Sequence, residues 1–155
     1  MSDDPKKVAL VLIDIQNDFV SRLEPQSAKI FETATKRWLQ LFRAANQKVV
    51  HLKTEVRPDL TNALPRWRKS NLQICIEGSV GADSPRDLEP KGDEQVFIKT
   101  FYGAGQHFID HWIASEVREV VLIGLFSHAC VQAIAIQLYE AGLEVSLGWD
   151  AIESY

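Results

Sequence analysis

Three residues of the kinds that carry out covalent acyl transfer stand at or just behind apolar stretches of the sequence: Asp14, Lys99 and Cys130. A cysteine thiolate can attack a carbonyl carbon, and a neighbouring carboxylate can take and return its proton. An ammonium group beside them stabilises the carboxylate and lowers the pKa of the thiol. Each residue alone also has an ordinary explanation: an aspartate that caps a turn, a solvated lysine, or an inert buried cysteine. Their coincidence at three strand ends favours a catalytic site.

The surroundings of Cys130 indicate how it is positioned. An apolar run over 119–123 ends at Gly124, and a helical pattern begins at Ser127 with an apolar stripe at i, i+3, i+4 and i+7: Val131, Ile134, Ala135 and Leu138. Gly142 ends this helix. Cys130 therefore falls in the first turn of a helix, just past the carboxyl end of a buried strand. Free backbone N–H groups and the positive end of the helix favour a thiolate there, so we expect a lowered pKa for Cys130.

The remaining elements alternate between strands and helices. Apolar runs predict five strands, and amphipathic patterns predict helices between them; the strands are expected over 8–13, 48–53, 95–98, 119–123 and 143–147, and the helices over 30–45, 106–114 and 127–141. This order predicts an α/β protein with a three-layer α/β/α Rossmann-like fold and a mainly parallel central sheet. The carboxyl ends of parallel strands lie along one edge of the sheet, where ligands bind in such folds.

The segment 54–94 shows no clear periodicity, because prolines and glycines interrupt it throughout. Loops of this length in a compact domain usually have a function. We expect one of two arrangements here. Either the side chains of Trp67, Trp112 and the basic residues 66, 68 and 69 cover a pocket, or Trp67 packs beneath the loop. Residues 72–76 are expected to form one short buried turn or strand.

Composition narrows the classes of function. The chain has 155 residues, 46% of them hydrophobic, and a net charge of -4, which is typical of one globular domain over residues 1–155. We expect neither nucleic acid nor membrane as a partner. The two cysteines, Cys75 and Cys130, do not form a disulfide framework, so we expect a cytoplasmic protein with a structural Cys75. The last strand lies near Tyr155 and leaves a sheet edge that missing residues or a second subunit would cover, so we expect a homo-oligomer.

The sequence also resembles a known family. The motifs Ala9–Phe19, Val96–Lys99 and Val121–Val131, followed by Tyr139–Val145 and Asp150–Ala151, are similar to those of the isochorismatase-like cysteine hydrolases. This superfamily contains nicotinamidases, N-carbamoylsarcosine amidohydrolases and ureidoacrylate hydrolases. The resemblance covers nearly the whole chain, with the motifs in order.

The resemblance implies specific roles for residues of this chain. Asp14, Lys99 and Cys130 would form a catalytic triad, in which Cys130 attacks the substrate and Asp14 transfers the proton. A cis peptide would join Leu125 to Phe126, and the N–H groups of Phe126 and Cys130 would form an oxyanion hole. The residues expected to contact substrate are Gln16, Phe19, Trp67, Tyr102 and His128. No cofactor is implied.

The chain departs from the family in ways that sharpen the expected function. The region 54–59 lacks the histidine of a nicotinamidase-type metal motif, so we expect no metal; His107 and His111 are taken as surface residues and His51 as packed within a strand. A nucleophilic cysteine points to cleavage of a C–N bond in a small amide, carbamoyl or ureido substrate.

The unusual segment 101–106 and the absence of the last helix and strand leave an alternative: a catalytically silent binding or interaction module. A receiver-type phosphoacceptor is disfavoured, because the acidic pair of that class is missing.

Overall fold

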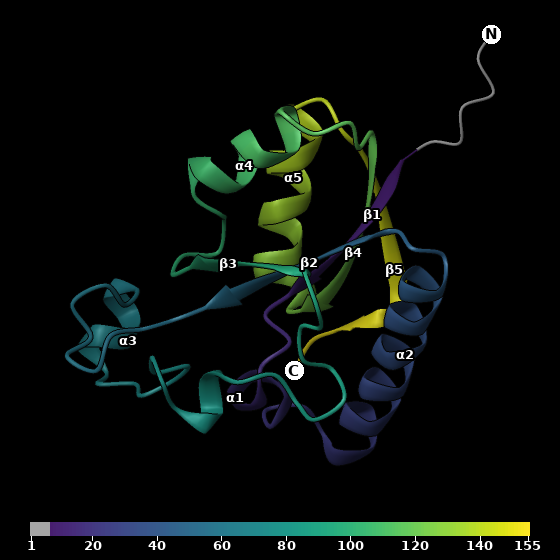
Figure 1. The fold of residues 1–155 in the computed structure, drawn as a ribbon. Coiled ribbons are helices and arrows are strands. Elements are labelled where there is room, and N and C mark those ends of the chain that lie inside the picture. Colours follow the sequence, from purple (N-terminus) through teal and green to yellow (C-terminus); the bar gives the residue numbers. More distant parts are fainter. Residues whose placement is uncertain (1–6) are drawn as a thin grey trace, which may run out of the picture.

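A computed structural model describes residues 7–155, and its centre is a five-stranded sheet in which every strand runs parallel to its neighbours (Figure 1). The strand order is β3-β2-β1-β4-β5. The strands are β1 (Val8–Ile13), β2 (Lys48–Thr54), β3 (Gln95–Lys99), β4 (Glu119–Leu125) and β5 (Glu144–Glu153). The predicted α/β fold with a parallel sheet is confirmed, and the first four strands lie within two residues of their expected bounds.

Helices cover both faces of the sheet, as Figure 1 shows: α2 lies on one face, and α4 and α5 lie on the other. The helical segments are α1 (Asn17–Val20), α2 (Pro25–Ala44), α3 (Pro65–Lys69), η1 (Val80–Ala82), α4 (Gln106–Ile113), η2 (Ser127–Val131) and α5 (Gln132–Glu140). The carboxylate of Glu24 caps α2 by accepting hydrogen bonds from the N–H groups of Gln26 and Ser27. Pro25 is the first residue of the helix, where its missing N–H costs nothing.

The central strand β1 explains why the first apolar run shows no alternation. Leu10 and Leu12 pack into the core on the α2 side, together with Phe31. Ala9 and Val11 pack into the core on the opposite side, with residues of α4 and α5. Residues Ala9 to Ile13 are at most 1% exposed, because both faces of the strand are covered.

The last strand is longer than expected: β5 extends to Glu153 rather than ending near residue 147. Glycine and polar residues interrupt its apolar pattern, and two of them, Gly148 and Asp150, pack against α2. A Cβ atom on Gly148 would lie 2.6 Å from Ile123 and 3.0 Å from the Trp38 ring, so the helix packs directly on the glycine. The indole of Trp38 donates a hydrogen bond to Asp150 (2.8 Å), and Arg37 forms an ion pair with the same carboxylate.

The long segment after β2 is ordered by contacts rather than by regular structure. It contains α3 and η1, and Val56 forms an isolated parallel bridge with Ile76. Polar side chains that follow β1 form hydrogen bonds with the backbone of this long segment. Asn17 donates a hydrogen bond to the carbonyl oxygen of Val80 (2.8 Å), and the carboxylate of Asp18 accepts one from the N–H of Cys75 (2.7 Å). The start of α1 therefore fixes the segment that was expected to be an irregular loop.

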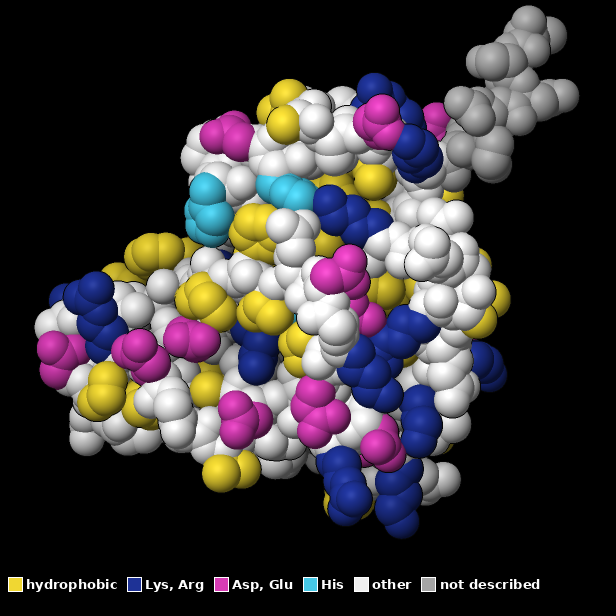
Figure 2. All heavy atoms as spheres, viewed as in Figure 1, with side chains coloured by type: hydrophobic (Ala, Val, Ile, Leu, Met, Phe, Trp, Pro, Cys, Tyr) yellow, Lys and Arg dark blue, Asp and Glu magenta, His cyan; other side chains and the backbone are white. Residues whose placement is uncertain are grey.

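The surface carries both signs of charge. Figure 2 shows acidic and basic side chains interspersed on this face, with histidine side chains close to α4. None of the helices within residues 7–155 combines the length and the apolar character needed to cross a membrane.

Candidate active site

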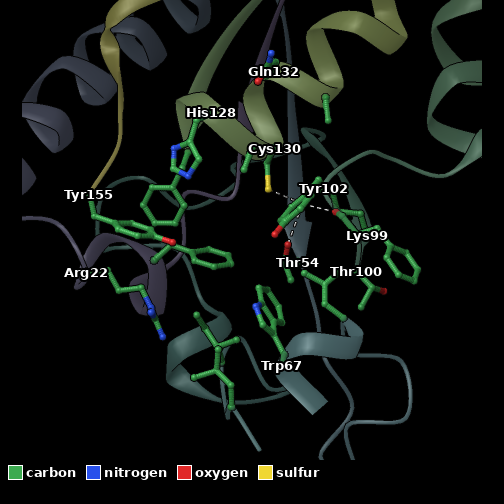
Figure 3. A pocket seen from close by; sticks show the side chains of 18 of the residues that line it. Arg22, Thr54, Trp67, Lys99, Thr100, Tyr102, His128, Cys130, Gln132 and Tyr155 are labelled. Atoms are coloured by element: carbon green, nitrogen blue, oxygen red, sulfur yellow. Dashed lines mark hydrogen bonds between the residues drawn. The ribbon is translucent and has the colours of Figure 1, made fainter. Parts of the chain in front are cut away.

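The structure brings together the three residues that the sequence analysis singled out. The ammonium nitrogen of Lys99 lies 2.8 Å from Oδ2 of Asp14. It also lies 3.4 Å from the sulfur of Cys130 (Figure 3). All three side chains are buried, and Asp14 is only 1% exposed. A buried ion pair therefore stands directly beside a thiol.

The parallel sheet creates this juxtaposition. Asp14 follows β1 directly, in a left-handed conformation (φ 52°) that aspartate tolerates better than most residues, and its N–H donates to the carbonyl oxygen of Leu52. Lys99 is the last residue of β3. Cys130 lies in η2, a wide turn that connects β4 to α5. A cis peptide bond joins Leu125 to Phe126 at the end of β4, as the family resemblance implied.

Thr54 is a member of the cluster that sequence reasoning missed. Its hydroxyl donates a hydrogen bond to Oδ1 of Asp14 (2.8 Å) and accepts one from the ammonium of Lys99 (3.1 Å). Thr54 is the last residue of β2 and pairs in register with Lys99. The strand order is what identifies Thr54 as a member of the cluster. Because β2 lies between β1 and β3, its final side chain lies between Asp14 and Lys99.

Lys99 is held in its charged form. Burial lowers the pKa of this ammonium, but the nearby carboxylate of Asp14 and the sulfur of Cys130 raise it more, so the net shift is upward. The carbonyl oxygen of Phe101 accepts a further hydrogen bond from Nζ (3.0 Å). The lysine thus supplies a fixed positive charge rather than a proton.

The expected low pKa of Cys130 is wrong. Burial raises the pKa of its thiol to about 12, and the negative charge of Asp14 adds to the rise, whereas Lys99 lowers it. The helix end and the lysine favour the thiolate, but desolvation dominates because the residue is only 7% exposed. Cys130 therefore rests as a neutral thiol, and a base must take its proton during any reaction.

A cavity of about 380 Å³ opens above the sulfur, which is a size typical of small-molecule sites. In Figure 3, Cys130 points into this space from one side and Trp67 of α3 from the other. Four of the five residues expected to contact substrate line the cavity: Phe19, Trp67, Tyr102 and His128. Trp67 also packs beside Phe19, with ring centroids 6.5 Å apart, so it both lines the pocket and anchors the loop.

Gln16 does not line this cavity, contrary to expectation. It is fully buried, and its amide nitrogen donates to the carbonyl oxygens of Thr54 (2.7 Å) and Ala82 (2.9 Å). Its amide oxygen accepts the N–H of Thr54 (2.8 Å). Because these bonds occupy the amide, Gln16 positions the end of β2 and the long segment instead of contacting a ligand.

Other residues that the sequence analysis discussed pack within the fold and do not form a site. Trp112 is 1% exposed in the core on the α4 side and does not line the cavity at Cys130. Cys75 is fully buried, and burial raises the pKa of its thiol. The rings of His107 and His111 pack around Phe97. Within residues 7–155, no group of three or more His, Cys, Asp or Glu side chains is arranged to hold a metal ion.

The cavity wall contains residues that the sequence did not single out. Arg22, Phe101, Gln132, Ile136 and Tyr155 contribute to it, beside Phe126 of the expected oxyanion hole. Tyr155 meets the ring of Phe126 edge-on at 4.7 Å, and the imidazole of His128 forms a hydrogen bond with the hydroxyl of Ser154 (2.6 Å). These residues carry no local sequence pattern; the fold alone makes them neighbours.

Comparison with known proteins assigns the chain to a family. The family model for the isochorismatase domain matches residues 8–155, and the chain belongs to this family. Streptothricin hydrolase from Streptomyces noursei is 32% identical over 152 residues, which cover 95% of this chain and 50% of that protein. The chain thus spans about half the length of this relative. The secreted isochorismatase effector Isc1 from Verticillium dahliae is 25% identical over 92% of this chain and 70% of its own.

A solved structure of the same family has the same fold. The isochorismatase family protein from Desulfovibrio vulgaris subsp. vulgaris str. Hildenborough superimposes with a TM-score of 0.87 at 26% identity. The match covers 96% of this chain and 83% of that chain. The fold expected from the sequence is therefore one that this family is known to adopt.

Proposed function

We propose that the protein is a hydrolase that cleaves a C–N bond in a small amide, carbamoyl or ureido compound, with Cys130 as the nucleophile. The observation that carries the proposal is the sulfur of Cys130 beside the Asp14–Lys99 ion pair at the floor of a cavity. Membership of the isochorismatase domain family and similarity to a streptothricin hydrolase support a hydrolytic activity.

The first half of the reaction transfers the acyl group to sulfur. As Cys130 attacks the carbonyl carbon, its proton passes to the carboxylate of Asp14. Asp14 suits this role, since its Oδ2 lies 2.8 Å from the ammonium of Lys99 and the same carboxylate acts on the thiol of Cys130. The negative oxygen that develops on the substrate would be bound by the N–H groups of Phe126 and Cys130. The C–N bond then breaks, and the departing nitrogen takes the proton from Asp14.

The second half returns the enzyme to its starting state. Asp14 removes a proton from water, and the resulting hydroxide attacks the thioester carbon. The C–S bond breaks, the acid product leaves, and the proton returns from Asp14 to the sulfur. Throughout the cycle, the ammonium of Lys99 stabilises whichever of its two neighbours is negative.

Release of ammonia from a panel of small amides and ureas tests this proposal. Cys130→Ala is expected to reduce turnover by about a thousandfold or more, because no other nucleophile replaces the sulfur. Cys75→Ala is the matched control, since it removes the other buried thiol and is expected to retain activity. Equal rates for the wild type and Cys130→Ala would refute the mechanism. Absence of turnover with every compound would favour the silent binding module.

Three further assignments remain proposals: no metal or other cofactor, a cytoplasmic location and self-association. Both described cysteines are free thiols, which supports a reducing compartment. The strand β3 forms a sheet edge on which Val96 and Ile98 are 45% and 39% exposed, a surface that suits a second copy of the chain. Light scattering of the purified protein would test association, and fractionation of the source cells would test location.

A further inference from the structure

The charges around the cavity restrict the substrate. Among the described residues that line it, none is aspartate or glutamate, although acidic residues outnumber basic ones in the chain, 21 against 17. Three lining residues are basic: Arg22, Lys99 and His128. Asp14 lies behind the wall, where Lys99 neutralises it. A ligand in this cavity therefore meets positive charge without acidic neighbours.

Arg22 is the cation left available to a ligand. The ammonium of Lys99 is already engaged by Asp14, Thr54, Phe101 and Cys130. The guanidinium of Arg22 forms no hydrogen bond or ion pair with any residue in 7–155, whereas Arg37 and Arg43 pair with carboxylates. A guanidinium presents paired N–H donors that match a carboxylate in a bidentate arrangement.

The backbone that carries Arg22 is well anchored. Arg22 follows α1 in a tight turn, where its N–H bonds to the carbonyl oxygen of Phe19 (3.1 Å). Its neighbour Leu23 is 5% exposed, and Asp18 ties the same helix to the long segment. The position of the guanidinium is thus limited to the rotamers of one side chain at the cavity wall. Figure 3 places Arg22 beside Tyr155 and away from Lys99.

Aromatic rings form much of the wall of the cavity. Phe19 meets Phe126 edge-on at 5.7 Å and lies beside Trp67, and Tyr102 contributes to the same wall. Aromatic walls favour flat apolar groups, which stack or pack edge-on against them. The cavity of about 380 Å³ has room for one ring with two substituents rather than for a large ligand.

Resting on the proposed hydrolase function, we propose that the substrate is a small planar amide that also carries a carboxylate, and that Arg22 binds this carboxylate. The amide carbon lies at the sulfur of Cys130, the flat body lies between the aromatic side chains, and the carboxylate reaches Arg22. This assigns Arg22 as the residue that selects substrates by charge.

Three para-substituted benzamides of equal shape test the proposal: 4-carbamoylbenzoate, 4-methylbenzamide and 4-(aminomethyl)benzamide. The wild type is expected to prefer the carboxylate over the neutral compound by about fivefold to tenfold in kcat/KM, mainly through KM, and to use the ammonium compound least. The preference should shrink as salt rises from about 0.05 M to about 0.5 M, because Arg22 is exposed to solvent.

Variants at Arg22 sharpen the test. Arg22→Gln should bring the KM values of the three compounds to within about twofold of each other, and Arg22→Glu should reverse their order, as expected for an exposed ion pair. Arg86→Gln is the control, because Arg86 is an exposed arginine that does not line the cavity. A wild type that treats the three compounds alike, or an Arg22→Glu variant with the wild-type order, would overturn the assignment.

Calorimetric titration of Cys130→Ala with the same compounds separates this proposal from the hydrolase proposal, because binding is then measured without turnover. Tighter binding of the carboxylate that disappears when Arg22→Gln is added supports the assignment, whatever the turnover. Selective binding together with a wild type that hydrolyses none of the three would count against the hydrolase and keep the carboxylate site. Failure of all three compounds to bind at millimolar concentration would overturn the assignment.

Discussion

Two clusters of charged side chains, one buried and one partly buried, lie on different parts of this sheet and have different roles. One is Asp14, Lys99 and Cys130 at the carboxyl ends of the strands. The other is Arg43, Glu94 and His51, between α2 and the start of β3. Each contains a carboxylate held by a cation.

The two clusters differ in how fully the carboxylate is bonded. Glu94 accepts two hydrogen bonds from the guanidinium of Arg43 (2.6 and 2.9 Å), one from His51 (2.9 Å) and one from the N–H of Lys91 (3.1 Å). These partners outweigh burial and lower the pKa of Glu94 to about 2. Asp14 has fewer partners: Oδ1 accepts a hydrogen bond from Thr54, and Oδ2 contacts the ammonium of Lys99 (2.8 Å) beside the thiol of Cys130 and the cavity. A carboxylate with four hydrogen-bond donors and no thiol beside it stabilises the fold, whereas one with fewer donors beside a thiol can take a proton.

The largest expected effect comes from Asp14→Asn. Turnover should fall by about a hundredfold to ten-thousandfold, because the base that accepts the thiol proton is lost. Since Asp14 raises the pKa of Cys130, the substitution should also lower that pKa and speed alkylation of the thiol by iodoacetamide near pH 8. Ammonia release and mass-spectrometric alkylation rates measure the two effects. Slower alkylation together with unchanged turnover would contradict the role given to Asp14.

The second prediction concerns stability. Glu94→Gln should lower the free energy of unfolding by about 3 to 5 kcal/mol, because it leaves the guanidinium of Arg43 partly buried without its counter-charge. The kcat of the folded protein should not change. Glu89→Gln alters an exposed carboxylate nearby and should change stability by less than about 0.5 kcal/mol. Urea unfolding at neutral pH measures the change in the free energy of unfolding for both variants. Equal changes would show that the Glu94 cluster stabilises the fold no more than an exposed carboxylate does.

A smaller effect is expected at Thr54, which acts through its neighbours. Thr54→Val removes the hydroxyl that bridges Asp14 and Lys99 and should lower kcat by about tenfold to a hundredfold, with little change in KM. Thr54→Ser keeps the hydroxyl and should restore kcat to within about threefold of the wild type. If both variants behaved alike, the methyl group rather than the hydroxyl would be the important feature.

The smallest effect is the response of stability to acid. Because the fold lowers the pKa of Glu94 from 4.5 to about 2, its contribution is complete above pH 4.5 and is lost as pH falls toward 2. Burial lowers the pKa of His51 from 6.5, against the raising effect of Glu94, so protonation of this histidine begins to oppose folding below pH 6.5. Urea midpoints at about pH 7, 5.5 and 3.5 should therefore fall in that order. In Glu94→Gln, the decline below pH 4.5 should flatten.

Local patterns located most of the strands but described the segments between the elements poorly. Apolar runs located β1 and β4 because a strand buried on both faces needs an unbroken series of apolar residues. The same rule failed at β5, where Gly148 and Asp150 interrupt the series but pack against α2. It also failed for the segment after β2, which is held by Gln16, Asn17 and Asp18 rather than by its own periodicity.

The sequence by itself determined that Asp14, Lys99 and Cys130 stand at strand ends, because strand periodicity and parallel connections are properties of short stretches of chain. The tertiary structure alone decided that Thr54 joins them, that the amide of Gln16 is already bonded, and that the pKa of Cys130 is raised. Desolvation and hydrogen-bond saturation depend on which distant residues meet. No local pattern contains that information.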